Sequence, residues 1–387
     1  MGTVEIKNTG NKTRINTLDS LRGFAAVTVV IGHITGGTRI GEFMNATPLY
    51  LLRAGHEAVV FFFMLSGYVL VYQFGAMPKA KYGDFLISRF LRLYVPYIAA
   101  IALSLWLFRL HTPGVQGQLF ISQLWRDKIT NGTLIGHFFL IGDFDSSALN
   151  PVIWSLVIEM RMSILFPLLQ YLLKLPRTKW FTIIMVTTLL AAIAMVFSTL
   201  LWGGYYNGYL STPYFLYVFM LGGVIAKNQS YLVLKYRALN LKTKVLLTLV
   251  CVLLYTYGHA VPLLIANSIY IPGLVRSTFL IQDFSVAIAS FYFIVAAIAV
   301  TNSKNILNKK LPLFLGKISY SLYLVHLPVI CFVYFSLNGK LPLPAILTLG
   351  VLSAVGLAVL FNRLIEKPVM KLARRVFLRD AAVLNTK

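Results

Sequence analysis

Long apolar runs alternate with shorter polar segments from residue 18 to residue 364. A helix needs about 20 mainly apolar residues to cross the roughly 30 Å hydrocarbon core of a bilayer. The pattern therefore predicts an all-α integral membrane protein, a bundle of about ten transmembrane helices. The predicted spans cover residues 18–37, 56–75, 90–110, 150–173, 180–202, 211–227, 245–265, 284–302, 313–336 and 342–364.

The polar flanks complete the predicted organisation. A cytoplasmic tail at residues 1–17 precedes a transmembrane domain at 18–366, and a basic cytoplasmic tail follows at 367–387. The polar start has no apolar core of a signal peptide before Leu18, so we expect the first span to insert uncleaved. The longest connection, 110–149, holds an apolar stretch at 133–142 that is too short to span, which we expect to lie in the interface or to re-enter the membrane.

Composition excludes a soluble protein. Of the 387 residues, 58% are hydrophobic and 12% are charged, whereas a soluble domain carries about 25% charged residues. The two cysteines, Cys251 and Cys331, lie in apolar runs and offer neither a disulfide framework nor a metal-ligand spacing. We therefore expect a multi-pass membrane protein with no bound metal.

The distribution of charge explains the net charge of +23. With the N-terminus inside, 26 of the 35 Lys and Arg residues fall in predicted cytoplasmic segments and seven in external ones, while Arg22 and Arg161 lie within spans. Cytoplasmic loops of membrane proteins carry such an excess of basic residues. The charge thus supports two cytoplasmic termini and gives no reason to expect a nucleic-acid partner. The basic C-terminal tail fits a surface of anionic lipid.

Three ionisable side chains fall at similar depth inside predicted spans. At 1.5 Å per residue, His33 lies roughly 22 Å, Glu159 roughly 16 Å and His326 roughly 20 Å from the inner face. Ionisable groups in the bilayer core are costly and mark functional sites by default. Each one alone could instead join two helices by a hydrogen bond, but their shared depth predicts one buried polar site.

Basic side chains lie nearer the cytoplasmic side of the same helices. Arg22 precedes His33 by almost three whole turns, so both face the same way, roughly 16 Å apart. Arg89 and Arg92 share a face at the start of the third span. Positive-inside anchoring and snorkelling explain such residues in general. The sharper hypothesis is that they bind the phosphates of an anionic ligand whose reactive end reaches His33.

Several catalytic motifs are absent from the sequence. It contains no G-x-S-x-G, no G-x-x-x-x-G-K-[ST], no H-E-x-x-H and no C-x-x-C. Serine-hydrolase, P-loop and zinc chemistry therefore have no support in the sequence.

Five segments stand out in order along the chain: LDSLRGFAAVTVVIGH (18–33), FFFMLSGYVL (61–70), SRFLRLYVPY (88–97), WSLVIE (154–159) with FP at 166–167, and LGKISYSLYLVH (315–326) with IEKP at 365–368. Together they resemble the membrane-bound acyltransferases of family 3, which O-acylate sugars of surface polysaccharides and related glycans. The run MRMSILFP after Glu159 departs from the aromatic pair found in many members, which affects the expected pocket shape.

The resemblance implies an enzyme of the bacterial cytoplasmic membrane that uses acyl-CoA, usually acetyl-CoA, as donor substrate, with no bound cofactor. Its acceptor would be a hydroxyl of a surface-glycan or lipid-linked sugar. Arg22 and His33 would form the first-span motif, Arg89 and Arg92 the basic motif at the cytoplasmic face, and Glu159 the acid of the WSLxxE motif.

His33 has two possible roles in this chemistry. It could deprotonate the acceptor hydroxyl while Glu159 supports the imidazolium, or carry the acyl group covalently. Tyr320, Tyr323 and His326 could position the thioester or the acceptor. Two rival functions are a transporter with a His/Glu proton relay and an acyltransferase acting on a lipid or a peptide.

Overall fold

The computed structural model is all-helical throughout the residues it describes, which are 15–75, 81–110, 117–125, 129–202, 208–258, 260, 272–300 and 306–383. Some predicted features lie outside the described residues. They are parts of the predicted tails, the ends of the predicted spans 245–265 and 284–302, and the predicted external residues Arg126 and Lys128. The helices are α1 (Asn16–Thr35), α2 (Arg39–Asn45), α3 (Gly55–Gly75), α4 (Tyr82–Leu110), α5 (Asn131–Phe138), α6 (Trp154–Ile164), α7 (Phe166–Lys174), α8 (Arg177–Trp202), α9 (Ser211–Lys227), α10 (Gln229–Ala238), α11 (Leu241–Tyr257), α13 (Pro272–Ala299), α14 (Lys310–Leu337), α15 (Leu343–Phe361) and α16 (Lys367–Val383). Short helical turns are η1 (Pro48–Leu52), η2 (Phe120–Gln123), η3 (Ser146–Ala148), η4 (Pro151–Ile153), η5 (Ile306–Asn308) and the π-helical turn η6 (Asn362–Glu366).

Each predicted span falls on a helix or on a pair of helices, but not every one of these helices is long and apolar enough to cross a membrane. Among the described residues, five helices are long and apolar enough to cross a membrane, and up to seven do so if each of two bent pairs forms one span. The span predicted at 150–173 is one of these pairs: α6 and α7 meet at 59°. Pro167 stands in the first turn of α7, where it cannot donate a hydrogen bond back to α6.

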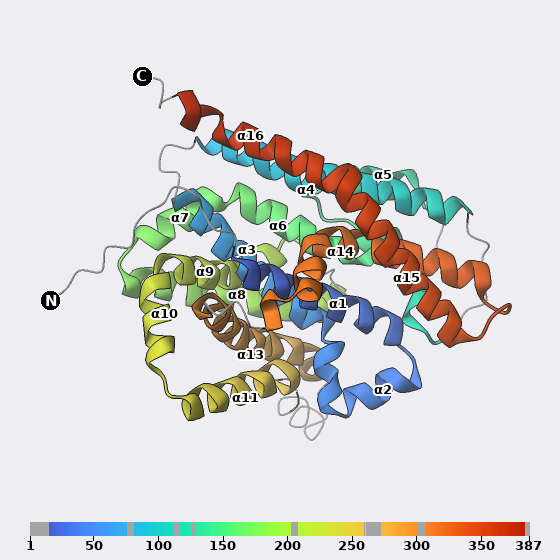
Figure 1. The fold of residues 1–387 in the computed structure, drawn as a ribbon, viewed down its shortest axis with the longest axis horizontal. Coiled ribbons are helices and arrows are strands. Elements are labelled where there is room, and N and C mark those ends of the chain that lie inside the picture. Colours follow the sequence, from blue (N-terminus) through green and yellow to red (C-terminus); the bar gives the residue numbers. More distant parts are fainter. Residues whose placement is uncertain are drawn as a thin grey trace.

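Helix α14 lies at the centre of the bundle, beside α1 (Figure 1). Most of its apolar residues are buried inside the protein. Glycines allow α1 and α14 to approach closely, because a side chain at Gly23 would collide with Leu315 and Gly316, and one at Gly316 would collide with Asp19. Small residues at helix interfaces are typical of membrane bundles. The close approach places Asp19 and Arg22 of α1 beside the first turns of α14.

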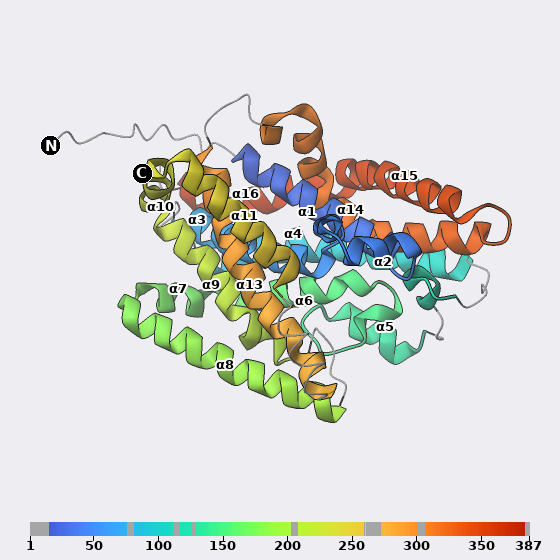
Figure 2. The ribbon, with the colours of Figure 1, turned by 90° about the horizontal axis from the view of Figure 1, so that it is seen from below.

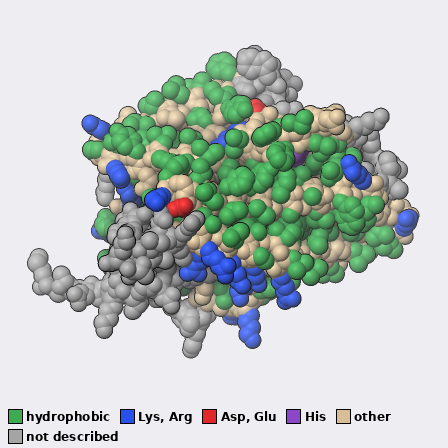
Figure 3. All heavy atoms as spheres, turned by 90° about the horizontal axis from the view of Figure 1, so that it is seen from above, with side chains coloured by type: hydrophobic (Ala, Val, Ile, Leu, Met, Phe, Trp, Pro, Cys, Tyr) green, Lys and Arg blue, Asp and Glu red, His purple; other side chains and the backbone are tan. Residues whose placement is uncertain are grey.

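Helices at the edge of the bundle present apolar side chains outward. Helix α8 runs along one edge, beside α7 (Figure 2). Its side chains Phe181, Leu189, Leu190 and Phe197 are more than half exposed. In a membrane protein such side chains contact lipid. The opposite view shows a broad hydrophobic surface with Lys and Arg side chains gathered beside it (Figure 3).

The chain after the last predicted span does not form a separate tail. Helix α15 continues through η6 into α16, and α16 lies alongside α4 (Figure 1). Ala373 is buried in this contact, and the rings of Phe377 and Phe85 lie 6.2 Å apart. The predicted boundary at residue 366 therefore falls inside a continuous helical segment, and the start of the basic tail packs on the bundle.

The apolar stretch predicted at 133–142 forms the short helix α5 and the turn after it. Tyr94 and Tyr97 of α4 donate hydrogen bonds to the carbonyl oxygens of Phe138 and His137. Ile135 and Phe138 remain more than half exposed. The segment thus packs against α4 with an apolar outer face, as expected of a segment in the membrane interface.

Candidate active site

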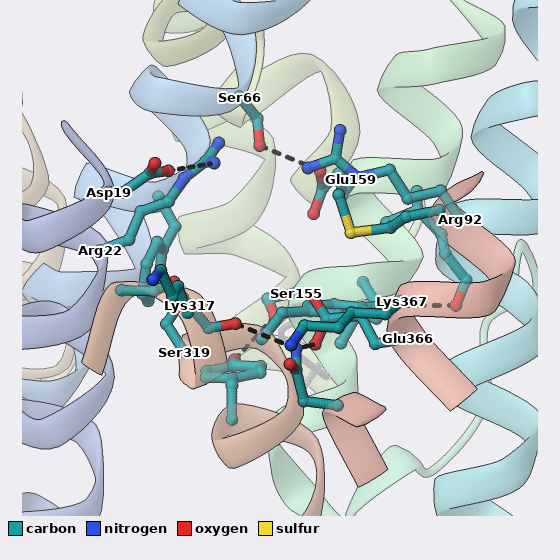
Figure 4. Close-up of a pocket in the computed structure, with 18 of the residues that line it drawn as sticks. Asp19, Arg22, Ser66, Arg92, Ser155, Glu159, Lys317, Ser319, Glu366 and Lys367 are labelled. Atoms are coloured by element: carbon teal, nitrogen blue, oxygen red, sulfur yellow. Dashed lines mark hydrogen bonds and ion pairs between the residues drawn. The ribbon is translucent and has the colours of Figure 1, made fainter. Parts of the chain in front are cut away.

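A cavity of about 480 Å³ opens at the end of the bundle where α1 and α14 begin (Figure 4). Helices α1, α3, α4, α6 and α14 and the segment from η6 into α16 all contribute to its wall. Its volume falls in the range of small-molecule sites. The lining residues are Asp19, Arg22, Phe62, Phe63, Ser66, Arg92, Leu93, Ser155, Leu156, Glu159, Gly316, Lys317, Ser319, Tyr320, Tyr323, Asn362, Glu366, Lys367, Met370, Lys371 and Arg374.

The cavity wall is predominantly basic. Six Lys or Arg side chains face three carboxylates there, which leaves a formal charge of +3. Arg22 lies at the edge of the cavity within 3.8 Å of Asp19, and Arg92 lies across from it beside Glu159 (Figure 4). Such a wall favours an anionic ligand, and arginine forks suit phosphate in particular.

The π-helical turn η6 shapes one side of the cavity. Asn362 donates to the carbonyl oxygen of Lys317 at 3.0 Å and to Glu366 at 2.7 Å. Ser321 of α14 donates to the same Glu366 oxygen at 2.5 Å. A π turn inside a helix commonly occurs at a functional site. Here it directs Asn362 and Glu366 toward α14 and ties the α15–α16 junction to it.

Glu159 forms an ion pair with Arg89 rather than contacting a histidine. The Arg89 Nη2 donates to Glu159 Oε1 at 2.7 Å, and Ser66 donates to the same oxygen at 3.0 Å. Arg89 Nε also donates to Ser163 at 3.2 Å. Arg89 is only 6% exposed and lies behind Glu159, outside the cavity wall formed by the described residues. The two arginines at 89 and 92 therefore occupy different positions: Arg92 faces the ligand space, and Arg89 holds Glu159.

The predicted support of His33 by Glu159 is thus not present in the structure. The partner of His33 is His326, whose Nε2 lies 3.0 Å from His33 Nδ1. The two rings are nearly parallel with their centroids 5.2 Å apart, as expected for imidazoles joined edge to edge by this hydrogen bond, and the ring of Phe120 lies 5.1 Å from that of His33. The sequence predicted three ionisable groups in one site, and the structure joins two of them directly.

Hydrogen bonding fixes the tautomers of this histidine pair. His326 Nδ1 lies 2.9 Å from the carbonyl oxygen of Leu322, and a carbonyl can only accept, so Nδ1 carries the proton. The Nε2 of neutral His326 is then an acceptor, and His33 Nδ1 must donate to it. The remaining nitrogen of neutral His33, Nε2, is unprotonated, and it has no hydrogen-bond partner among the described residues.

Tyr323 stands between the cavity and the histidine pair. Its hydroxyl bonds to the carbonyl oxygen of Val152 at 2.9 Å and to Ser155 at 2.7 Å. Its ring lines the cavity and lies 6.3 Å from the ring of His326. Tyr320, also in the wall, donates to the carbonyl oxygen of Leu93 at 3.1 Å. Both tyrosines thus line the cavity, whereas His33 and His326 are not among its lining residues.

Arg161 faces away from Glu159, as its spacing of two residues predicts. Its guanidinium donates to the carbonyl oxygens of Ile141, Gly142 and Gly208 at 2.9, 2.7 and 3.1 Å. Arg161 therefore holds the turn after α5 against the start of α9 and has no place in the cavity wall formed by the described residues.

A second buried polar cluster was not predicted from the sequence. Asp283 on α13 bonds to His56 at 2.6 Å and to Tyr214 at 2.9 Å. Next to it, Glu57 accepts hydrogen bonds from Tyr50 and Gln282 at 2.7 and 3.0 Å. Most of these residues stand at or just outside the ends of predicted spans, where polar side chains are common, and Tyr50 lies in η1 between two spans. No group of three metal-ligating side chains occurs in the described parts of the chain.

Comparison with known proteins identifies a family and a set of relatives. A family model described as an acyltransferase domain matches residues 15–363. Three curated relatives, each named O-acetyltransferase OatA, from Staphylococcus aureus strains NCTC 8325, COL and MRSA252, are 27% identical over 383 residues. The alignments cover 93% of this chain and 58% of each relative, so the chain spans little more than half of their length. No solved structure matches it. The basic cavity, the histidine pair and the family match lead to one conclusion: the chain belongs to the membrane-bound acyltransferases of family 3.

Proposed function

We propose that the protein is an O-acyltransferase that moves an acetyl or similar short acyl group from cytoplasmic acyl-CoA to a hydroxyl of a surface-glycan or lipid-linked sugar. The observation that carries this proposal is the basic cavity whose buried end lies one tyrosine away from a pair of histidines. The name of the relatives, O-acetyltransferase, supports an acetyl group. The bacterial cytoplasmic membrane is the proposed location, because it separates acyl-CoA from surface glycans.

The donor binds in the cavity with its phosphates against the basic wall. Arg22 and Arg92 come from two helices on opposite sides of the ligand space (Figure 4). The thioester arm extends toward Phe62, Leu156 and Tyr323, where the wall is apolar apart from hydroxyl groups. Glu159, held by Arg89, presents a carboxylate to the amide groups of that arm.

The histidine pair supplies the base. His33 Nε2 accepts the proton of the sugar hydroxyl, and the sugar oxygen attacks the thioester carbonyl. The carbon–sulfur bond breaks, and CoA leaves as the thiolate. His33 is then an imidazolium, stabilised by the hydrogen bond from its Nδ1 to His326. For the thioester to reach His33, the side chain of Tyr323 must turn aside.

The test of this function is acyl transfer by the purified protein in lipid nanodiscs. Labelled acetyl-CoA should yield an acetylated sugar, identified by mass spectrometry after incubation with lipid-linked glycan. Transfer to phospholipid or to peptide instead would identify the rival acceptors, and absence of transfer from any acyl-CoA to any of these acceptors would contradict the proposal.

Arg92→Ala should raise the KM for acetyl-CoA by about tenfold or more, since it removes a charge-assisted phosphate contact. The acceptor KM should change little. Lysine at this position should restore donor binding only in part, because it lacks the planar fork. Arg109→Ala is the matched control, an exposed arginine at the other end of α4. An unchanged donor KM in Arg92→Ala would mean that Arg92 is only an anchor at the membrane surface.

A further inference from the structure

Helix α16 brings three basic side chains to the cavity. Lys367, Lys371 and Arg374 all line it, and their spacings of four and three residues place them on one face of the helix. The family match ends at residue 363, and these residues follow it in the chain. The sequence alone assigned them to a tail at the lipid surface.

The structure fixes this face of α16 relative to the donor cavity. The helix begins directly after η6, where Glu366 accepts hydrogen bonds from Ser321 and Asn362. Further along, Ala373 is 3% exposed, and Phe377 packs edge-on against Phe85 of α4. Held at its first turn and again at Phe377, α16 forms a wall of the cavity and does not lie free on the membrane.

Burial orders the cavity from its closed end to its rim. Tyr323 and Ser155 in the cavity wall are each 7% exposed, whereas Lys367, Lys371 and Arg374 on α16 are all exposed. Arg374 lies roughly 10 Å beyond Lys367 along the helix axis, on the side away from the η6 contacts to α14. These two side chains therefore stand at the rim, where the part of a ligand most distant from its reactive end would lie.

The chemistry of acyl-CoA fits this order. Its thioester stands at one end, a diphosphate follows the arm, and the ribose carrying a 3′-phosphate lies beyond the diphosphate. We propose that Lys371 and Arg374 form the subsite for the 3′-phosphate of the donor. The inference rests on the proposed function and extends the donor site beyond residue 363, where the family match ends. An arginine and a lysine side by side suit a phosphate monoester, the arginine through its fork and the lysine as a point charge.

The test compares two donors, acetyl-CoA and 3′-dephospho-acetyl-CoA, in steady-state transfer. In the unaltered protein, loss of the 3′-phosphate should raise the donor KM by about tenfold or more, as expected for a charge-assisted contact. Lys371→Ala with Arg374→Ala should raise the KM for acetyl-CoA by a similar factor and leave the KM for the dephospho donor nearly unchanged. Both side chains are exposed, and alanine favours helix, so the double variant should fold.

Arg375→Ala is the matched control, because Arg375 is an exposed arginine at the adjacent position and is not part of the cavity wall of the described residues. It should behave as the unaltered protein with both donors. An equal loss in the control would show a general effect of surface charge at the membrane and overturn the proposal. So would a double variant that loses as much with the dephospho donor as with acetyl-CoA.

Direct binding separates this inference from the proposed function. Calorimetry of CoA with the protein in nanodiscs does not depend on turnover. If the unaltered protein binds no CoA, the donor assignment itself fails. If it binds CoA and the double variant binds CoA as tightly, only the 3′-phosphate subsite is wrong.

Discussion

His33→Ala is expected to lower the rate of acyl transfer by about 100- to 10,000-fold, the usual contribution of a positioned general base. The KM for acetyl-CoA should stay nearly constant, because His33 is not part of the cavity wall to which we assign the donor. Steady-state kinetics of the purified variant measures both quantities. Transfer within a few-fold of the unaltered rate, from protein that is folded and inserted, would rule out His33 as base and as acyl carrier.

A second variant and a search for an acylated intermediate separate the two possible roles of His33, general base and acyl carrier. His326→Ala removes the acceptor of the His33 Nδ1 proton, so the tautomer of His33 is no longer fixed and the rate should fall, although less than in His33→Ala. A base leaves no covalent trace, whereas a carrier leaves an acyl-histidine on the enzyme. Mass spectrometry of protein quenched during turnover without acceptor should detect no acylated His33 if it acts as base.

Breaking the Arg89–Glu159 pair is expected to have the second large effect. Arg89 is buried whereas Glu159 is partly exposed in the cavity, and a buried charge left without its partner destabilises a protein by about 3–5 kcal/mol. Glu159→Gln and Arg89→Ala should therefore each lower the thermal unfolding temperature and nearly abolish transfer. The measurement is thermal unfolding in detergent together with acyl transfer at a temperature where each variant is folded.

A double replacement separates stability from function at this site. Arg89→Met with Glu159→Leu replaces both charges by apolar groups of similar length, which often restores stability. It should recover the unfolding temperature and remain inactive, because Glu159 faces the ligand space. Recovery of activity in the double variant would show that the pair serves only to hold α4 against α6.

The helical bundle was predictable because an apolar run of about 20 residues can satisfy its backbone hydrogen bonds in a bilayer by forming a transmembrane helix. Breaks within spans were harder to foresee. The bend after Ile164 depends on Pro167, and many membrane helices contain proline without such a bend. The π turn at Asn362–Glu366 has no local sequence signal, since its hydrogen bonds reach Lys317 and Ser321 on another helix.

The sequence predicted which residues belong to the candidate site, but it did not predict which of them contact one another. Depth along each span placed His33, Glu159 and His326 near one another. The contacts among them depend on how α1, α4, α6 and α14 are rotated against one another. His33 and His326 are 293 positions apart, so no local sequence pattern indicates that they touch. Lys371 and Arg374 were missed for a different reason. A basic amphipathic helix has the same pattern whether it faces lipid headgroups or a cavity.

In the mechanism we propose, acyl-CoA enters the basic cavity from the cytoplasm and its acyl group leaves toward the opposite side. Sealed vesicles of known orientation test it, with labelled acetyl-CoA supplied on one side and lipid-linked glycan present in the membrane. Transfer should occur only when acetyl-CoA is on the side where α1 and α14 begin, and acetylated glycan should be exposed on the other side. Acetylated glycan confined to the donor side would contradict transfer across the membrane.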